Sequence, residues 1–407
     1  MRLKVSWGLP GVLAVGVLLS AGPAAAQIYT QRPPATPASP NPVYLHLAAG
    51  DGFVLMADGW PQYIFGFQQI PNTTPDSRVM RLAELGAEFP APTLVMEEGT
   101  QVYLNLSNVG MPMRPDLFDS HSIHFHGFPQ AAPVFDGLPE SSVTIKMGST
   151  FTYFYNLVEP GTYLYHCHVE ATEHMQMGML GNLYVRPKQD KCGTAGNPVC
   201  PGGLPAGSRF AYNDGDGSTR YDVEAPLQVS GFDRIYHDQH IAVQPLPFAA
   251  MRDTDAMING RGYPDTVVVG TIPAPTTDDS GGKDWAKDPF GRTGPQRVTS
   301  KVTATAGQRI LLRLSNVSVQ AFYTIASPSI PMQVVGVNAR LLAGPTGNKL
   351  YYTTHSVNLG GGESMDLILD TTGLAPGTYF LYTTNLNYLS NYAQDLGGAM
   401  TEIVIGG

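Results

Sequence analysis

Two short runs of the chain gather histidines around a single cysteine. The first is His-Ser-Ile-His-Phe-His-Gly at 121–127, and the second is Tyr-His-Cys-His at 165–168, which His174 and Met179 follow. Six of the ten histidines and one of the three cysteines lie in these stretches. Thiolate and thioether ligands beside imidazoles favour copper, and two histidines, one cysteine and a weak methionine are typical of a blue-copper centre.

Strand geometry sorts these ligands into two sets. If 121–126 and 163–168 are β-strands, alternate side chains face opposite sides. The first set, completed from the loop that follows, has two imidazoles, a thiolate and a thioether: His121, Cys167, His174 and Met179. The second set has four imidazoles and no sulfur: His124, His126, His166 and His168. We expect an electron-transfer copper at the first and copper that meets oxygen or a small oxyanion at the second, with Cys167 as a short covalent route between them.

Three methionines compete for the axial position of the first set. A methionine is also a flexible filler of apolar cores. Met179 follows His174 by five positions, which is enough for a loop to return its side chain to the metal. We therefore expect Met179 to be the ligand, with Met175 and Met177 as the alternatives.

The composition indicates an all-β protein with two domains. A chain of 407 residues is too long for one small sandwich. Its 45 glycines, 34 prolines and 20 tyrosines, with only 14% charged residues, are typical of many short strands joined by turns. The formal net charge of −9 would become −11 if Arg2 and Lys4 left with a leader. This acidity argues against nucleic acid or an anionic membrane as a partner.

The N-terminus predicts export. Arg2 and Lys4 precede an apolar run at 9–19, and three alanines at 24–26 offer a cleavage site before Gln27. The apolar run is too short for a comfortable membrane span. We expect a signal peptide at 1–26, a Pro-rich tail at 27–42, and a periplasmic or secreted protein.

The other two cysteines enclose a short loop with glycine and proline. In an exported protein, Cys192 and Cys200 would form a local disulfide in the linker at 189–220. A metal site there is the weaker alternative, because further thiols are lacking. Cys167 then remains free, as a metal thiolate must be.

A degenerate internal repeat divides the chain. Two pairs of segments correspond: 92–109 with 303–317, and 159–168 with 375–384. Each has a turn with glycine followed by β-branched and aromatic residues. We expect two Greek-key β-sandwiches, at 43–188 and 221–407. The second lacks copper ligands, because 382–384 reads Tyr-Thr-Thr where the first has His-Cys-His.

The paired histidine motifs resemble those of the multicopper oxidases, specifically the two-domain, laccase-like members. In that family both motifs occur together in one cupredoxin domain, and the resemblance covers most of this chain. By position it implies four ligands of type 1 copper: His121, Cys167, His174 and Met179. It also implies His124 as a ligand of type 2 copper, and it assigns three residues to the type 3 pair: His126, His166 and His168.

The resemblance also points to two acidic residues. Glu170 stands where many family members place a carboxylate that relays protons to reduced oxygen, and Asp136 matches another acidic position near the cluster. We expect both to be catalytic. The alternatives are a solvated loop acid for Glu170 and an Asp-Gly turn for Asp136.

The family's complete trinuclear cluster needs eight histidines, four from each of two domains, and the motifs here supply four. The remaining histidines form no His-x-His pair: His46, His237, His240 and His355. We expect His237 and His240 in surface loops. Copper nitrite reductase is a close relative, but its catalytic aspartate would fall at His124, and the histidine of its second domain at Asn385 or a neighbour.

These features predict an exported copper oxidoreductase of the multicopper-oxidase type. An organic or metal-ion reductant would donate single electrons through an exposed edge of His174, and oxygen would be reduced at the four-histidine site. A non-catalytic electron carrier or copper-binding cupredoxin and a copper nitrite reductase are the alternatives, and a redox partner protein is another candidate electron donor.

The resemblance also predicts how the chains assemble. Two-domain relatives pack the first domain of one subunit against the second domain of the next in a ring of three, so we expect a homotrimer. The second domain would then cover the four-histidine face with non-histidine groups from 382–392, or with His355.

Overall fold

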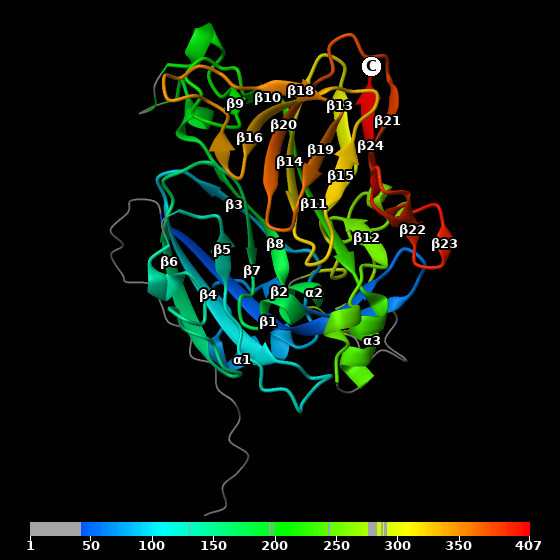
Figure 1. Cartoon of the computed structure of the whole chain (residues 1–407). Helices are drawn as coiled ribbons and strands as arrows, with labels where there is room; N and C mark the ends of the chain where they lie inside the picture. Colours follow the sequence, from blue (N-terminus) through cyan, green and yellow to red (C-terminus); the bar gives the residue numbers. More distant parts are fainter. Residues whose placement is uncertain are drawn as a thin grey trace, which may run out of the picture.

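The chain folds into two β-sandwiches, shown one above the other in Figure 1. The computed structural model describes residues 42–129, 131–194, 197, 199–242, 245–275, 283–285, 288 and 291–407. The expected leader, and the Pro-rich tail up to residue 41, lie outside these residues. The predicted all-β, two-sandwich fold class is confirmed. None of the helices that the structure describes is long and apolar enough to cross a membrane.

The first sandwich packs two four-stranded sheets. One has the order β2-β1-β4-β6: β1 (Val43–Leu55), β2 (Pro61–Gln69), β4 (Gln101–Gly110) and β6 (Thr150–Asn156). The other has the order β3-β8-β7-β5: β3 (Ala91–Glu97), β5 (His124–His126), β7 (Gly161–His166) and β8 (Leu180–Arg186). Strand alternation builds the core between them, as Val102, Leu104 and Leu106 of β4 show, since all three are fully buried in it.

The second sandwich has a large sheet and a five-stranded one. The large sheet runs β17-β16-β20-β14-β11-β12-β22-β23, with β18 paired to β16. Its strands are β11 (Val223–Phe232), β12 (Asp255–Ile258), β14 (Arg309–Asn316), β16 (Met332–Val337), β17 (Arg340–Leu341), β18 (Tyr352–Thr354), β20 (Ser364–Asp370), β22 (Ser390–Asn391) and β23 (Gln394–Asp395). The smaller sheet runs β13-β24-β21-β15-β19: β13 (Val302–Thr305), β15 (Tyr323–Ala326), β19 (Ser356–Leu359), β21 (Gly377–Thr383) and β24 (Met400–Gly406).

The strand pairings reproduce the internal repeat. In the first sandwich β4 runs parallel to β1 and antiparallel to β6, and in the second β14 runs parallel to β11 and antiparallel to β20. In the same way, β8 lies between β3 and β7 as β24 lies between β13 and β21. The histidine strands β5 and β7 therefore correspond to β15 and β21 of the second sandwich.

The described part of the chain has three α-helices beside the strands: α1 (Asp76–Ala83), α2 (Ala171–Gln176) and α3 (Arg234–Ala242). The segment between the sandwiches contains the predicted disulfide, Cys192–Cys200, and a two-stranded ribbon of β9 (Arg209–Phe210) and β10 (Arg220–Tyr221). Cys167 is the free cysteine, and it is buried.

The two sandwiches share an apolar cluster. The first contributes Val54, Ile64, Phe89, Leu164 and Leu180, and the second contributes Phe232, Met257 and Val317, all at most 4% exposed. The rings of Phe89 and Phe232 lie 4.4 Å apart. Each sandwich therefore buries apolar side chains of the other one at this junction.

A buried ionic network also joins the sandwiches. The guanidinium of Arg313, in β14, donates to Glu224 at 2.8 Å and to Thr162 of the first sandwich at 3.0 Å. Thr162 in turn donates to Asp366 at 2.6 Å. Arg313 is fully buried, so these partners must offset the free-energy cost of removing its charge from water.

Candidate metal centres

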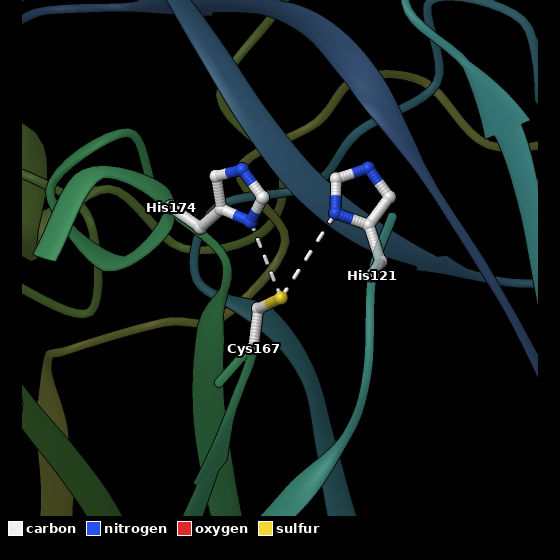
Figure 2. A group of neighbouring side chains, drawn as sticks. All are labelled: His121, Cys167 and His174. Atoms are coloured by element: carbon white, nitrogen blue, oxygen red, sulfur yellow. Dashed lines mark hydrogen bonds between the residues drawn. The ribbon is translucent and has the colours of Figure 1, made fainter. Parts of the chain in front are cut away.

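The structure brings His121, Cys167 and His174 together in one buried group (Figure 2). Cys167 follows the end of β7, His121 precedes β5, and His174 lies on α2. Both imidazoles turn Nδ1 toward the sulfur: the Sγ of Cys167 lies 3.3 Å from His174 Nδ1 and 3.9 Å from His121 Nδ1. One thiolate and two imidazoles that face a common point form a donor set that fits copper.

The predicted axial methionine lies beside this group along the backbone. The N–H of Cys167 donates to the carbonyl of Met179 at 3.1 Å, and the N–H of Met179 donates to the carbonyl of His174 at 2.9 Å. The side chains of Met177 and Met179 are both fully buried, whereas Met175 lines the pocket that contains the other four histidines of the motifs. Met179 and Met177 therefore remain as candidates for the thioether ligand.

Other residues cover the ring of His174, so the prediction that one edge of this ring is exposed is wrong. The side chain of His174 is 0% exposed. Its Nε2 lies 3.8 Å from Oδ2 of Asp119, and the ring of Phe65 meets it edge-on at 5.8 Å between centroids. The preceding residue, Glu173, accepts a hydrogen bond of 2.6 Å from His240 on α3. Helix α3, from the second sandwich, thus packs against the ligand segment, and its His240 also contacts Phe65 at 4.7 Å between ring centroids.

The pKa values of the two imidazoles in this group are shifted in opposite directions. Burial lowers the pKa of His121 well below its usual range, and the nearby His174 lowers it further. Burial also lowers the pKa of His174, but Cys167 and Asp119 outweigh it and raise that pKa to about 10. The raised value reflects negative groups around the ring, where a metal cation would take the place of the proton.

The four other histidines line one pocket. Antiparallel pairing of β5 and β7 places His124 opposite His166. Nδ1 of His126 lies 3.2 Å from Nε2 of His166, and the ring of His168 lies 5.2 Å from that of His124. The donor atoms of His124, His126 and His166 lie within 4.8 Å of one another, close enough to share a metal ion.

Backbone carbonyls fix the orientation of these rings. Nδ1 of His124 donates to the carbonyl of Asp136 at 2.7 Å, and Nδ1 of His166 donates to the carbonyl of Cys167 at 2.7 Å. Such bonds settle the tautomer and leave Nε2 free to bind metal. Burial lowers the pKa of His124, His126 and His166, that of His166 to about 3, so all three rings are in the neutral, metal-binding form at neutral pH.

The second sandwich forms the other wall of this pocket, whose volume is about 420 Å³. Its contribution is Ser318, Val319, Gln320, Ala321, Phe322, Gly361 and Gly362. Gly362 has φ +89°, and a Cβ on it would lie 2.8 Å from Nε2 of His126. Among the described residues, every group of three or more side chains that could hold a metal comes from the first sandwich.

The two predicted catalytic acids lie in different surroundings. Asp136 is next to the four-histidine pocket: besides the carbonyl bond, its carboxylate lies 3.4 Å from Nδ1 of His124. Glu170 is exposed at the start of α2, with φ +46°, and does not line the pocket. The structure therefore brings Asp136 to the cluster and leaves Glu170 outside it.

The expectation that His237 and His240 lie in surface loops is wrong. Both are on α3 and fully buried at the junction of the two sandwiches. His355 is exposed, contacts the carbonyl of Ser327 at 3.0 Å and does not line the four-histidine pocket. Asp119, Glu173 and the pocket wall of the second sandwich were also not predicted, because no motif in the sequence marks them.

Comparisons with known proteins agree with this arrangement. The chain matches the multicopper oxidase family over residues 69–190 and again over 235–403, together more than half of its length. It is 32% identical over 118 residues to "Multicopper oxidase MCE" of Talaromyces pinophilus and 30% identical over 121 residues to "Laccase 1" of Metarhizium acridum. These matches cover 28% and 29% of this chain, and this chain spans 18% of the length of each relative.

Solved structures share the fold over most of the chain. The blue copper oxidase from Nitrosomonas europaea superposes with a TM-score of 0.62 at 22% identity, covering 90% of this chain and 86% of that one. Copper nitrite reductase from Nitrosomonas europaea gives a TM-score of 0.55 at 18% identity, covering 90% and 95%. At this identity the likeness concerns the fold, whereas both sandwiches match the family by sequence. This chain therefore belongs to the multicopper oxidase family, and its cofactor is copper.

Proposed function

We propose that the chain is an exported copper oxidoreductase that oxidises a reductant one electron at a time and reduces oxygen in the four-histidine pocket. The observation that carries this proposal is the position of Cys167 between the two histidine groups. Its sulfur faces His121 and His174, its carbonyl accepts from His166, and its neighbours in the chain, His166 and His168, line the pocket. A single residue thus connects both groups through covalent bonds.

Each of the two sites would be formed by four of the predicted ligands. His121, Cys167, His174 and Met179 would hold type 1 copper, and His124, His126, His166 and His168 would hold copper at the second site. Bound copper would supply a store for electrons and a Lewis acid toward oxygen. The protein buries the first group away from water, and it keeps His124, His126 and His166 of the second group neutral beside an accessible pocket. Asp136 is the acid that we propose for proton delivery, with Glu170 as the second candidate.

Electrons would enter through the cover of His174. The ring reaches no solvent, and Asp119, whose side chain is 17% exposed, is the nearest carboxylate to Nε2. The reductant is a small organic molecule or a metal ion, with a redox partner protein as the alternative, and it would meet this cover and not the ring itself.

We further propose an incomplete cluster and a trimeric assembly. Among the described residues, three imidazoles of the pocket converge, and the wall from the second sandwich adds no further histidine, cysteine or carboxylate. This supports one or two coppers per chain. Phe322, on the pocket wall, is 71% exposed, an apolar group that a neighbouring subunit would cover. Domains at 43–188 and 221–407, with a leader removed at 26 and a periplasmic or secreted location, belong to the same proposal.

Copper counting combined with light scattering and an oxygen electrode tests this function. We expect the copper-loaded protein to show a thiolate band in the visible spectrum, to carry copper at both sites, and to consume oxygen when a reductant is supplied. One copper per chain without oxygen uptake would instead establish an electron carrier. Turnover of nitrite in place of oxygen would establish a nitrite reductase, and a stable monomer with four coppers per chain would contradict both the trimer and the incomplete cluster.

A further inference from the structure

Helix α3 of the second sandwich binds directly to the segment that supplies His174. His237 on this helix is fully buried, and both of its ring nitrogens face backbone carbonyls of the first sandwich. Nδ1 lies 2.6 Å from the carbonyl of Tyr63 in β2, and Nε2 lies 2.8 Å from the carbonyl of Gln176 in α2. One imidazole thus bridges a core strand and the ligand helix.

The chemistry of these contacts is one-sided. A carbonyl oxygen only accepts, so each contact is a hydrogen bond when the facing nitrogen carries a proton. Burial lowers the pKa of His237 to about 4, although the two carbonyls oppose that shift. Near neutral pH the ring is therefore neutral and donates one hydrogen bond at a time.

A second contact ties the same helix to the same segment. Nε2 of His240 donates to Glu173, the residue before His174, at 2.6 Å. Arg114, from the first sandwich, donates to the carbonyl of His240 and holds the end of α3 in place. The two histidines lie about one helical turn apart on α3, and they contact α2 at Gln176, its last residue, and at Glu173, near its middle.

We propose that α3 is a clamp on the type 1 copper site, with His237 and His240 as positioning residues that fix the ligand segment at 171–179. The inference rests on the type 1 assignment made above. The second sandwich, which supplies no ligand of its own, controls the site through this helix. Beneath the clamp, the N–H of Phe65 in β2 donates to the carbonyl of Met177 at 2.9 Å, so strand, helix and ligand segment form one unit.

The clamp acts on quantities that a remote structural residue would leave unchanged. The reduction potential and the spectrum of a blue-copper site depend on ligand geometry and on the hydrogen bonds around it. Release of α2 would let His174 move relative to Cys167. Nδ1 of His174 now lies 3.3 Å from Sγ of Cys167. We expect the site to adjust toward the geometry that oxidised copper prefers, which lowers its potential.

The test compares two variants with a matched control. His237→Phe fills the same space without a donor, and His237→Gln keeps a donor. His46→Phe removes another buried histidine, one that bonds Ser107 at 2.8 Å in the sheet of β1 and β4 and has no part in the clamp. The readouts are the potential and visible band of the copper-loaded protein, and amide hydrogen exchange across 171–179 in the metal-free protein.

We expect His237→Phe to lower the potential, to alter the band and to speed exchange at 171–179 about tenfold, the equivalent of one lost hydrogen bond of about 1.4 kcal/mol. His237→Gln should restore most of each property, and His46→Phe should leave all three as in the unmodified protein. An unchanged potential and unchanged exchange in a folded His237→Phe protein would overturn the clamp. The exchange measurement needs no copper. Faster exchange in His237→Phe would therefore uphold the contact of α3 with 171–179 even if the unmodified protein showed no blue band, a result that would reject the type 1 assignment.

Discussion

Replacement of Gly362 by alanine should weaken copper binding in the four-histidine pocket while the blue site survives. Gly362 has φ +89°, so alanine there costs about 1–2 kcal/mol in backbone strain alone. Its Cβ would also meet Nε2 of His126 at 2.8 Å, a separation that forces the ring to shift. Metal–ligand distances tolerate only about 0.2 Å, and disturbance of groups that orient a ligand typically weakens binding about 10- to 100-fold.

The chain offers a control that separates strain from the clash. Gly373 has φ +80° and no atom within 4 Å of its would-be Cβ, so Gly373→Ala carries the backbone cost without the contact. We expect both variants to lose roughly 2–4 °C in Tm per kcal/mol of strain. Copper analysis during titration should show weaker loading of the second site only in Gly362→Ala, with the visible band of Cys167 unchanged. Equal copper loading in both variants would refute the assignment of this pocket as a metal site.

Further predictions concern the blue site, the disulfide and acid stability. Cys167→Ser should abolish the visible band with the fold intact by circular dichroism, and a persisting band would exclude Cys167 as the ligand. Met179→Leu should keep the band and raise the reduction potential, because a weak donor that stabilises oxidised copper is lost; an unchanged potential would point to another methionine. Reduction of Cys192–Cys200 should cost about 2–3 kcal/mol of unfolding free energy in denaturant titrations, and free thiols in the untreated protein would contradict it. The metal-free protein should lose stability as pH falls from about 6.5 toward 3, by up to about 1.4 kcal/mol per pH unit for a group such as His166, because its pKa is lowered to about 3 and the unfolded chain takes up the proton first. A Tm that stays constant between pH 7 and pH 5 would speak against this.

The division of the ligands into two groups could be predicted because it is a local property of strands. Strand alternation predicted that His121 and Cys167 separate from the other histidines, although the strands are shorter than expected: β5 begins at His124 and β7 ends at His166. The internal repeat also predicted the correspondence of β7 with β21, since both copies keep the same turn and the same alternation. These expectations needed no knowledge of distant contacts.

The cover of His174 could not be predicted from the same signals. It depends on α3, which lies some 60 residues further along the chain and whose buried residues include His237, His240 and Arg234. Polar residues in a short helix are typical of a surface, so their burial at a junction between sandwiches depends on tertiary contacts alone. Gly362 was missed for a related reason: the absence of a side chain carries no chemical signal, although it makes room for His126.

The apolar cluster shared by the two sandwiches makes the first sandwich depend on the second. Phe232, Met257 and Val317 complete a core whose larger part belongs to the first sandwich. Deletion of the second copy would leave Phe89, Leu164 and Leu180 in water, at about 1.5–3 kcal/mol for each large side chain. The second sandwich, which adds no metal-binding group of its own among the described residues, is thus needed to complete the core of the first, and we expect the first sandwich alone to be unstable.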